Sequence, residues 1–103
     1  MEEFLDNLSS KQAKKIVWVL KLIEEIDPVP QQYLKKLVST DDIWEIRIKS
    51  GSDQFRLLCF FDQGQMVVLT NGFIKRTQKV PKQEIKLAEQ RKKDYLQRKQ
   101  NNE

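Results

Sequence analysis

Apolar residues recur every three or four positions between residues 11 and 26. This spacing is typical of one face of an amphipathic helix. The positions that form the stripe are Ala13, Ile16, Val17, Leu20, Ile23 and Ile26. Further apolar residues widen it, which indicates a helix packed against a sheet. Ser9 or Ser10 is a suitable N-cap, and Pro28 disfavours helical geometry at Asp27, so the helix is expected to end there.

The segment "QQYLKKL", residues 31–37, suggests a short second helix, and three strand patterns follow it. Segment 43–49 alternates, with Ile43, Glu45, Arg47 and Lys49 on one face and Trp44, Ile46 and Ile48 on the other. Segment 54–61, "QFRLLCFF", is apolar on both faces, as in a central strand covered on both sides, and Arg56 is its one charged member. Segment 66–70, "MVVLT", returns beside it after a hairpin connection.

A final helix is predicted over residues 81–99, with Pro81 near its first turn and residues 97–103 expected to fray. The order is therefore two helices, three strands and a helix. Short links between consecutive strands favour an antiparallel meander, which helices must cover. The sequence predicts a single α+β domain over residues 1–103, with two layers and a small three-stranded antiparallel sheet.

Composition limits the possible functions of this chain. Hydrophobic residues make up 39% of it and charged residues 33%, and no apolar run approaches the roughly 20 residues that span a bilayer. The short acidic start does not resemble a secretory signal, so a cytoplasmic location is expected. The lone Cys59 lies in an apolar run and suggests a buried thiol. The absence of histidine excludes the usual zinc sites and an imidazole base.

Positive charge is concentrated in the last third of the chain. Residues 1–70 contain nine Lys or Arg and eleven Asp or Glu, whereas residues 71–100 contain ten and three. Such a basic block indicates a polyanion or an acidic protein partner. A solvated C-terminal helix explains the same composition equally well.

The residues available for chemistry are mostly cationic. The three glycines, Gly51, Gly64 and Gly72, all fall at predicted turns, so there is no glycine-rich phosphate loop. An acid–base pair of Glu45 with the acids of "TDD", residues 40–42, is conceivable, but solvated charge is the simpler explanation.

A guanidinium in an apolar strand needs a partner. Arg56 is therefore expected to pair with Glu45 or Asp53, or to reach a bound anion. Cations gathered on one sheet face can stabilise the pentacovalent transition state of a phosphodiester without a metal ion. RNA supplies its own nucleophile, the 2′-OH, although basic patches also bind RNA without cutting it.

Four motifs together resemble the RelE/HigB toxin family, in its phage-derived HigB-like branch. They are "WEIR" at 44–47, "FR" at 55–56, "NGFIKRTQKVP" at 71–81 and "EIKLAEQRKKDY" at 84–95. The first helix and "YLKKL" also fit, so the resemblance covers nearly the whole chain. The family usually has a strand before the first helix, and this chain lacks that pattern, which implies a sheet without its N-terminal edge strand.

The resemblance implies the toxin of a type II toxin–antitoxin pair, an endoribonuclease that cuts mRNA in the ribosomal A site by 2′-OH attack, without metal or cofactor. A helix-turn-helix antitoxin is the implied partner, with DNA reached only through that complex and no membrane involved. By position, the implied catalytic residues are Arg47, Arg56, Lys75 and Arg76, and the implied RNA-binding residues are Lys49, Phe73, Lys79 and Lys82.

The general base is unassigned, because Glu45 replaces a family lysine. A catalytic role for Tyr95 is a weaker alternative to packing in the core. For the whole protein, two alternative functions remain open. One is a ParE-like gyrase poison of the same fold, and the other is a non-catalytic RNA-binding or regulatory remnant.

Overall fold

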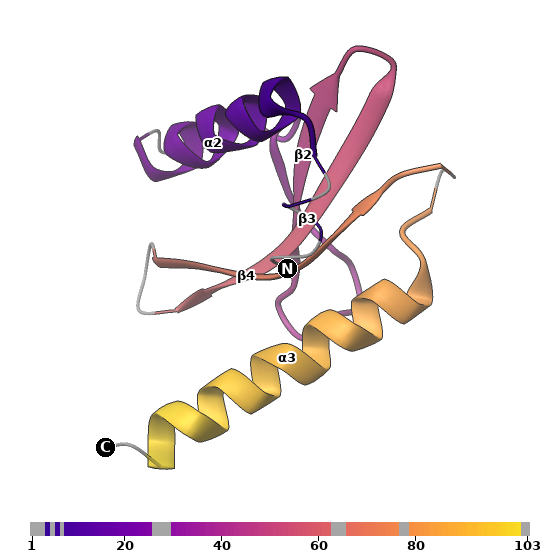
Figure 1. Ribbon diagram of the computed structural model, residues 1–103. Coiled ribbons are helices and arrows are strands. Elements are labelled where there is room, and N and C mark those ends of the chain that lie inside the picture. The colour runs from indigo at the N-terminus through magenta and orange to yellow at the C-terminus, as the bar shows by residue number, and fades with distance from the viewer. Residues whose placement is uncertain are drawn as a thin grey trace.

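A computed structural model describes residues 4, 6, 8–25, 30–62, 66–76 and 79–101 of the chain (Figure 1). Four antiparallel strands form one sheet in the order β1-β2-β3-β4. The elements are α2 (Ser10–Glu25), β1 (Leu34–Lys36), β2 (Trp44–Ser50), β3 (Asp53–Asp62), β4 (Met66–Ile74) and α3 (Lys82–Asn101). The α+β class predicted from the sequence is confirmed. The helices lie on opposite sides of the sheet, however, so there are three layers rather than two.

Helix α2 begins at a capping box. The Ser9 hydroxyl oxygen accepts a hydrogen bond from the Gln12 backbone N–H (3.2 Å), and the Ser9 N–H donates to the Gln12 side-chain oxygen (3.0 Å). Ser9 is therefore the N-cap. The other end is described as far as Glu25, and the predicted stop at Asp27 and Pro28 lies outside the described residues. In the part of the chain that the structure describes, no strand precedes α2.

The predicted helix over residues 31–37 is wrong, because this segment contains a turn and the edge strand β1. The Pro30 carbonyl accepts hydrogen bonds from the N–H groups of Tyr33 and Leu34, which closes the turn. Leu34 then pairs with Ile46 and buries its side chain in the core. Seven residues are too few for a stable isolated helix, and pairing with β2 satisfies the same backbone groups. The sheet therefore has four strands instead of three.

One face of the sheet packs against α2. Its core residues are Ile16, Val19 and Ile23 of α2 with Leu34, Ile46, Ile48, Phe55, Leu57 and Cys59 of the strands. This set includes Ile46 and Ile48, as the alternation of β2 predicts, and Cys59, whose burial raises its thiol pKa to about 12. Strand β4 continues to Ile74, so Gly72 lies inside the strand and not at a turn. A Cβ at Gly72 would lie 2.8 Å from Leu57 Cδ2, which explains the need for glycine.

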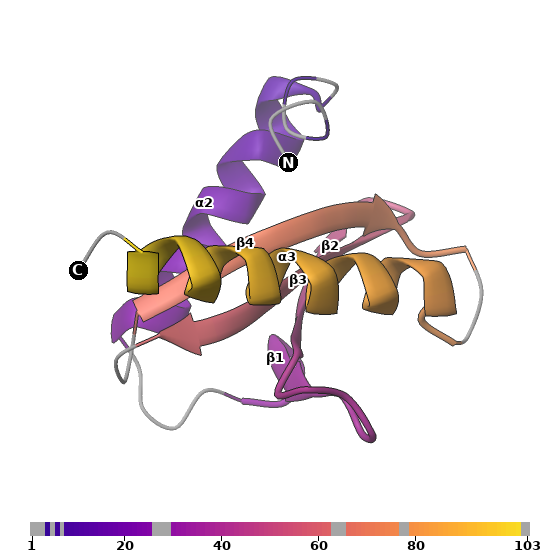
Figure 2. The same cartoon turned by 90° about the horizontal axis from the view of Figure 1, so that it is seen from below.

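Helix α3 covers part of the opposite face (Figure 2). Ala88 packs against Ile43 and Leu58, and the Asn71 amide donates to the Glu84 carbonyl (3.2 Å), which joins β4 to the start of α3. Helix α3 extends through residues 97–101, which the sequence analysis assigns to a frayed tail. The rest of this sheet face is left to charged side chains. Within the described residues, none of the helices has the length and apolarity needed to cross a membrane.

Candidate functional site

Strand register brings the predicted cations together on the same sheet face as α3, in the part that this helix does not cover. Arg47 lies directly opposite Arg56, and Arg56 lies opposite Phe73 on the next strand. Glu45 precedes Arg47 by two residues, so its side chain points to the same face. The side chains of Glu45, Arg47 and Arg56 form what we call the guanidinium cluster.

The pairing of Glu45 with Arg56 is predicted from the sequence, but its burial and its hydrogen bond with Arg47 are not. Its side chain is only 1% exposed, although the strand pattern assigns it to a charged surface. One carboxylate oxygen, Oε1, accepts a hydrogen bond from Arg47 Nε (2.7 Å) and lies 3.6 Å from Arg56 Nε. The other, Oε2, is buried without a hydrogen-bond partner among the described residues. The same-face spacing of Glu45 and Arg47 is the sequence signal that could have revealed this ion pair.

Arg56 is held in place by groups of its own strand. Its Nη1 donates to the Phe55 carbonyl (3.0 Å) and its Nη2 donates to Gln54 Oε1 (3.0 Å). Burial lowers the pKa of the guanidinium, Glu45 opposes that shift, and Arg47 adds to it. Of the two partners considered from the sequence, Glu45 is the one observed, while Asp53 accepts a hydrogen bond from Gln12 instead. The Arg56 guanidinium is therefore fixed beside a second cation.

Lys75 joins the guanidinium cluster electrostatically. Its backbone N–H donates to the Gln54 carbonyl (2.8 Å), which extends the pairing of β3 and β4 by one residue. Burial lowers the pKa of its ammonium group, and the nearby charge of Arg56 lowers it further. Arg76 is exposed, and both residues line a cavity of about 340 Å³ beside Gln54. Of the predicted basic pair, Lys75 therefore lies next to the guanidinium cluster and Arg76 is exposed to solvent.

The remaining predicted site residues divide into two groups. Lys49 lines a second cavity together with Arg47 and Arg56. Phe73 is half-buried and packs against the apolar cluster of Ile43, Leu58 and Ala88, and its contact with RNA stays a prediction. Lys79 and Lys82 are exposed in the connection to α3 and at its first residue.

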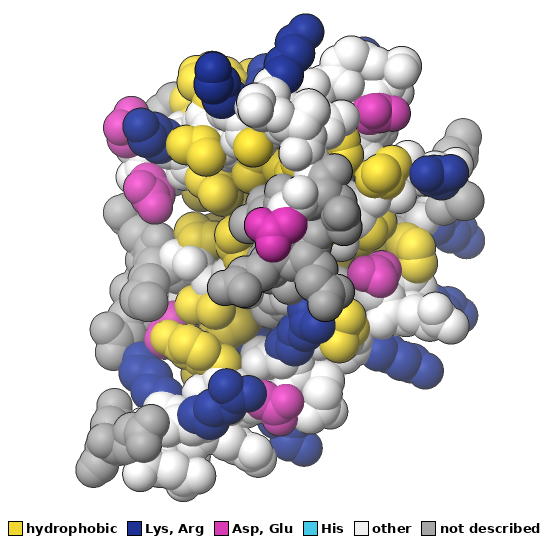
Figure 3. Space-filling view, viewed as in Figure 1, with side chains coloured by type: hydrophobic (Ala, Val, Ile, Leu, Met, Phe, Trp, Pro, Cys, Tyr) yellow, Lys and Arg dark blue, Asp and Glu magenta, His cyan; other side chains and the backbone are white. Residues whose placement is uncertain are grey.

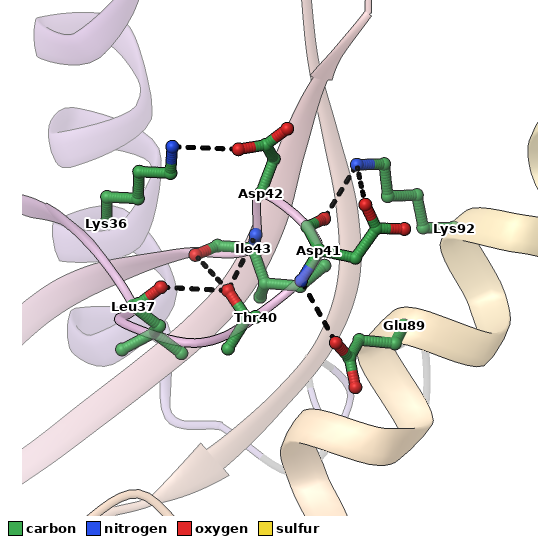
Figure 4. Close-up of polar contacts among 8 residues, drawn as sticks. All are labelled: Lys36, Leu37, Thr40, Asp41, Asp42, Ile43, Glu89 and Lys92. Atoms are coloured by element: carbon green, nitrogen blue, oxygen red, sulfur yellow. Dashed lines mark hydrogen bonds and ion pairs between the residues drawn. The ribbon is translucent and has the colours of Figure 1, made fainter.

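The acids of "TDD" lie in a separate polar network (Figure 4), which we call the loop cluster. It joins the loop before β2 to α3 through Lys36, Leu37, Thr40, Asp41, Asp42, Ile43, Glu89 and Lys92. Asp42 pairs with Lys36 (2.8 Å), and the hydrogen bond from that lysine lowers the pKa of its carboxyl. Asp41 pairs with Lys92 (3.6 Å). These acids are therefore structural partners and not a catalytic pair with Glu45.

Tyr95 has a packing role, as the simpler interpretation predicts. Its ring meets Phe60 edge-on at a centroid distance of 5.4 Å, and its hydroxyl donates to Asp62 Oδ2 (2.9 Å). That hydrogen bond raises the pKa of the phenol, with burial as the next cause. Tyr95 therefore anchors α3 to β3.

The described residues therefore form an α+β protein whose small antiparallel sheet holds an arginine pair on one face. A family model described as "Phage derived protein Gp49-like (DUF891)" matches residues 3–93. The chain therefore belongs to the Gp49-like family, which is grouped with the RelE/HigB-like toxins of toxin–antitoxin pairs. No curated protein and no solved structure matches the chain significantly.

Proposed function

We propose that this chain is a HigB-like toxin that cuts mRNA in the ribosomal A site and is neutralised by a helix-turn-helix antitoxin. The observation that carries the proposal is the pairing of Arg47 and Arg56 around a buried Glu45 carboxylate, with Lys75 at its side. Membership of a family grouped with RelE-like toxins supports the same reaction class.

The proposed reaction is transesterification within RNA. The 2′-OH loses its proton to solvent and attacks the adjacent phosphorus. A 2′-O–P bond forms and the P–O5′ bond breaks, which leaves a 2′,3′-cyclic phosphate and a 5′-OH once the leaving oxygen is protonated. The pentacovalent transition state carries more negative charge than the ground state, and preorganised guanidinium groups stabilise that difference. Arg56 is suited to this role because its own contacts already fix its fork.

Lys75 is suited to deliver a proton to the leaving 5′ oxygen. An ordinary lysine holds its proton too tightly at neutral pH for efficient transfer. Burial and the neighbouring Arg56 lower the pKa of Lys75, which brings it closer to the working pH. Arg76, exposed beside it, is then placed to contact RNA backbone.

Mapping of mRNA 5′ ends after brief induction, in a host without the antitoxin, tests the proposal. Wild-type protein is expected to produce new 5′ ends on translated messages. Arg56→Lys keeps the charge and loses the planar fork, so cleavage should fall about 100-fold, and a melting temperature measured in parallel identifies any loss of fold. Arg98→Lys on the exposed side of α3 is the matched control and should cut normally.

Two outcomes would count against the proposal in different ways. Intact mRNA with broken DNA would replace the ribonuclease function with gyrase poisoning. Full cleavage by Arg56→Lys would retain the ribonuclease function but remove Arg56 from its catalytic centre.

A further inference from the structure

A pocket of about 630 Å³ extends from the guanidinium cluster toward α2. It lies between α2, the turn before β1 and the strands β2 and β3, and this volume falls in the range of about 300–1,000 Å³ typical of small-ligand sites. Arg47 and Arg56 line it, together with Lys15 of α2 and Tyr33 before β1, which belong to neither the proposed catalytic group nor any predicted RNA contact. The pocket therefore adds residues that the proposed reaction does not use.

The charge of this pocket suits a phosphate. Lys15 and Lys49 line it together with the two arginines, and no lining residue is acidic. The surface over α2, at the upper left of Figure 3, carries basic and apolar side chains together with acidic ones at its left edge. Four cations around one cavity favour a polyanion that passes the catalytic arginines and continues along α2.

Tyr33 supplies a fixed aromatic ring beside these cations. Its N–H donates to the Pro30 carbonyl (3.0 Å), and its own carbonyl accepts from the Arg47 N–H (2.8 Å). Trp18 braces the ring edge-on at a centroid distance of 6.0 Å, and Lys15 Nζ lies 4.6 Å from the centre of the Trp18 ring. The backbone hydrogen bond places the Tyr33 ring close to Arg47, which is proposed to bind phosphate. An aromatic ring in such a position is suited to stack an unpaired base.

Two amide side chains complete the lining. Gln54 uses its oxygen to accept from Arg56, which leaves its NH₂ group as a donor. Gln32 is exposed next to Tyr33 and offers both a donor and an acceptor. Amides of this kind read the hydrogen-bonding edges of bases.

We propose that this pocket is a subsite for one nucleotide of single-stranded RNA next to the scissile phosphate. In this subsite the base packs against Tyr33, and the flanking phosphate contacts Lys15 and Lys49. The inference rests on the proposed ribonuclease function and deepens it, because it identifies where the enzyme selects sequence. It predicts that the pocket sets which nucleotide flanks the cut, whereas the guanidinium cluster sets whether a cut occurs.

Binding is tested with purified protein and 2′-O-methyl RNA hexamers, which lack the nucleophile and so cannot be cut. Tyr33→Leu should weaken binding about tenfold, the size of one lost stacking contact, and Tyr33→Phe should bind like wild type. Lys15→Gln should weaken binding several-fold more than Lys93→Gln, an exposed lysine of α3. Melting temperatures of all four variants identify any loss of fold.

Cleavage mapping provides the second arm. Tyr33→Leu should still cut mRNA but with a changed nucleotide distribution beside the cut. An unchanged distribution together with unchanged hexamer binding would overturn the subsite and leave the ribonuclease proposal intact. Equal weakening by Lys15→Gln and Lys93→Gln would also overturn it, since that pattern indicates general charge attraction. If wild-type protein cuts no mRNA, the ribonuclease function fails, and the hexamer arm alone then decides whether the pocket binds RNA.

Discussion

The guanidinium cluster and the loop cluster are both polar networks built around β2, and they differ in how completely their groups are satisfied. In the loop cluster, Thr40 Oγ1 donates to the Leu37 carbonyl (2.9 Å) and accepts from the Ile43 N–H (3.1 Å). Lys92 and Glu89 of α3 bind the backbone of Asp41 in the same network (Figure 4). In the guanidinium cluster, Glu45 Oε2 and Arg56 Nε are buried without hydrogen-bond partners among the described residues.

The two clusters therefore contribute differently to the stability of the fold. A buried polar atom without a partner costs about 1–3 kcal/mol, so folding alone does not favour it. The loop cluster holds α3 against the loop before β2, and its polar groups are hydrogen-bonded to one another. Within the described part of the chain, the guanidinium cluster leaves Glu45 Oε2 and Arg56 Nε without hydrogen bonds, so it is the less stabilising of the two networks.

The largest expected effect comes from Glu45→Gln. This change leaves two opposed guanidinium groups without a counter-charge, one of them 9% exposed in its side chain. Loss of one partner of a buried ion pair should lower the free energy of unfolding by about 3–5 kcal/mol. Urea denaturation measures this loss. An unfolding free energy within about 1 kcal/mol of wild type, which is less than a tenfold change in the folding equilibrium, would show that the pair is not buried as described.

The double variant Glu45→Leu/Arg56→Leu is the control for that result. An apolar pair of similar volume often restores or raises stability when it replaces a buried ion pair. The double variant should therefore fold like wild type yet cut no mRNA. Cleavage by this variant would mean that the guanidinium cluster serves the fold alone.

Lys75→Met should reduce mRNA cleavage about 100-fold, within the range for loss of a general acid. The stability of this variant should instead increase. The folded-state pKa of Lys75 is lowered, so the charged lysine disfavours folding at neutral pH, and this penalty disappears as the pH rises toward the ordinary value of 10.5. Denaturation at several pH values should show Lys75→Met more stable than wild type near pH 7, with the gain vanishing above about pH 10.5. Lys86→Met on α3 should show neither change.

Most of the fold could be predicted from local patterns, but β1 and the burial of Glu45 could not. The spacing of apolar residues predicts the helical period of α2 and the alternation of β2. Strand β1 depends on a pairing with β2, and its three residues carry no periodicity of their own. Long-range pairing therefore overrides the helical character of "QQYLKKL".

The candidate site was predictable in membership and not in burial. Arg47 and Arg56 meet because antiparallel neighbours align, which a meander already implies. The burial of Glu45 depends on how far the long cationic side chains beside it cover the strand, and a strand pattern does not contain that information. The partial burial of Phe73 was not predictable either, because it depends on β4 continuing past Thr70 and on packing with Leu58 and Ala88.

Thr40→Val tests the loop cluster and should have a smaller effect. The change keeps the side-chain shape and removes the hydrogen bonds of the hydroxyl with Leu37 and Ile43, so it should cost about 1–2 kcal/mol and lower the melting temperature by about 4–8 °C per kcal/mol. Cleavage measured below the transition should be unchanged. Thr40→Ser retains the hydroxyl and should recover most of the loss. A cleavage defect in folded Thr40→Val protein would show that the loop cluster also contributes to cleavage.

The smallest expected effect is at Lys82, the first residue of α3. A cation there opposes the helix dipole by about 0.3–1 kcal/mol, so Lys82→Ala should raise stability slightly. If Lys82 also holds RNA backbone, the same change should reduce the slope of log affinity against log salt by about 0.7 for single strands. Hexamer binding over a salt series measures that slope, and Lys93→Ala provides the control. A gain in stability with an unchanged slope would assign Lys82 to solvent, and the RNA-binding surface would then end at Arg76 on this side of the sheet.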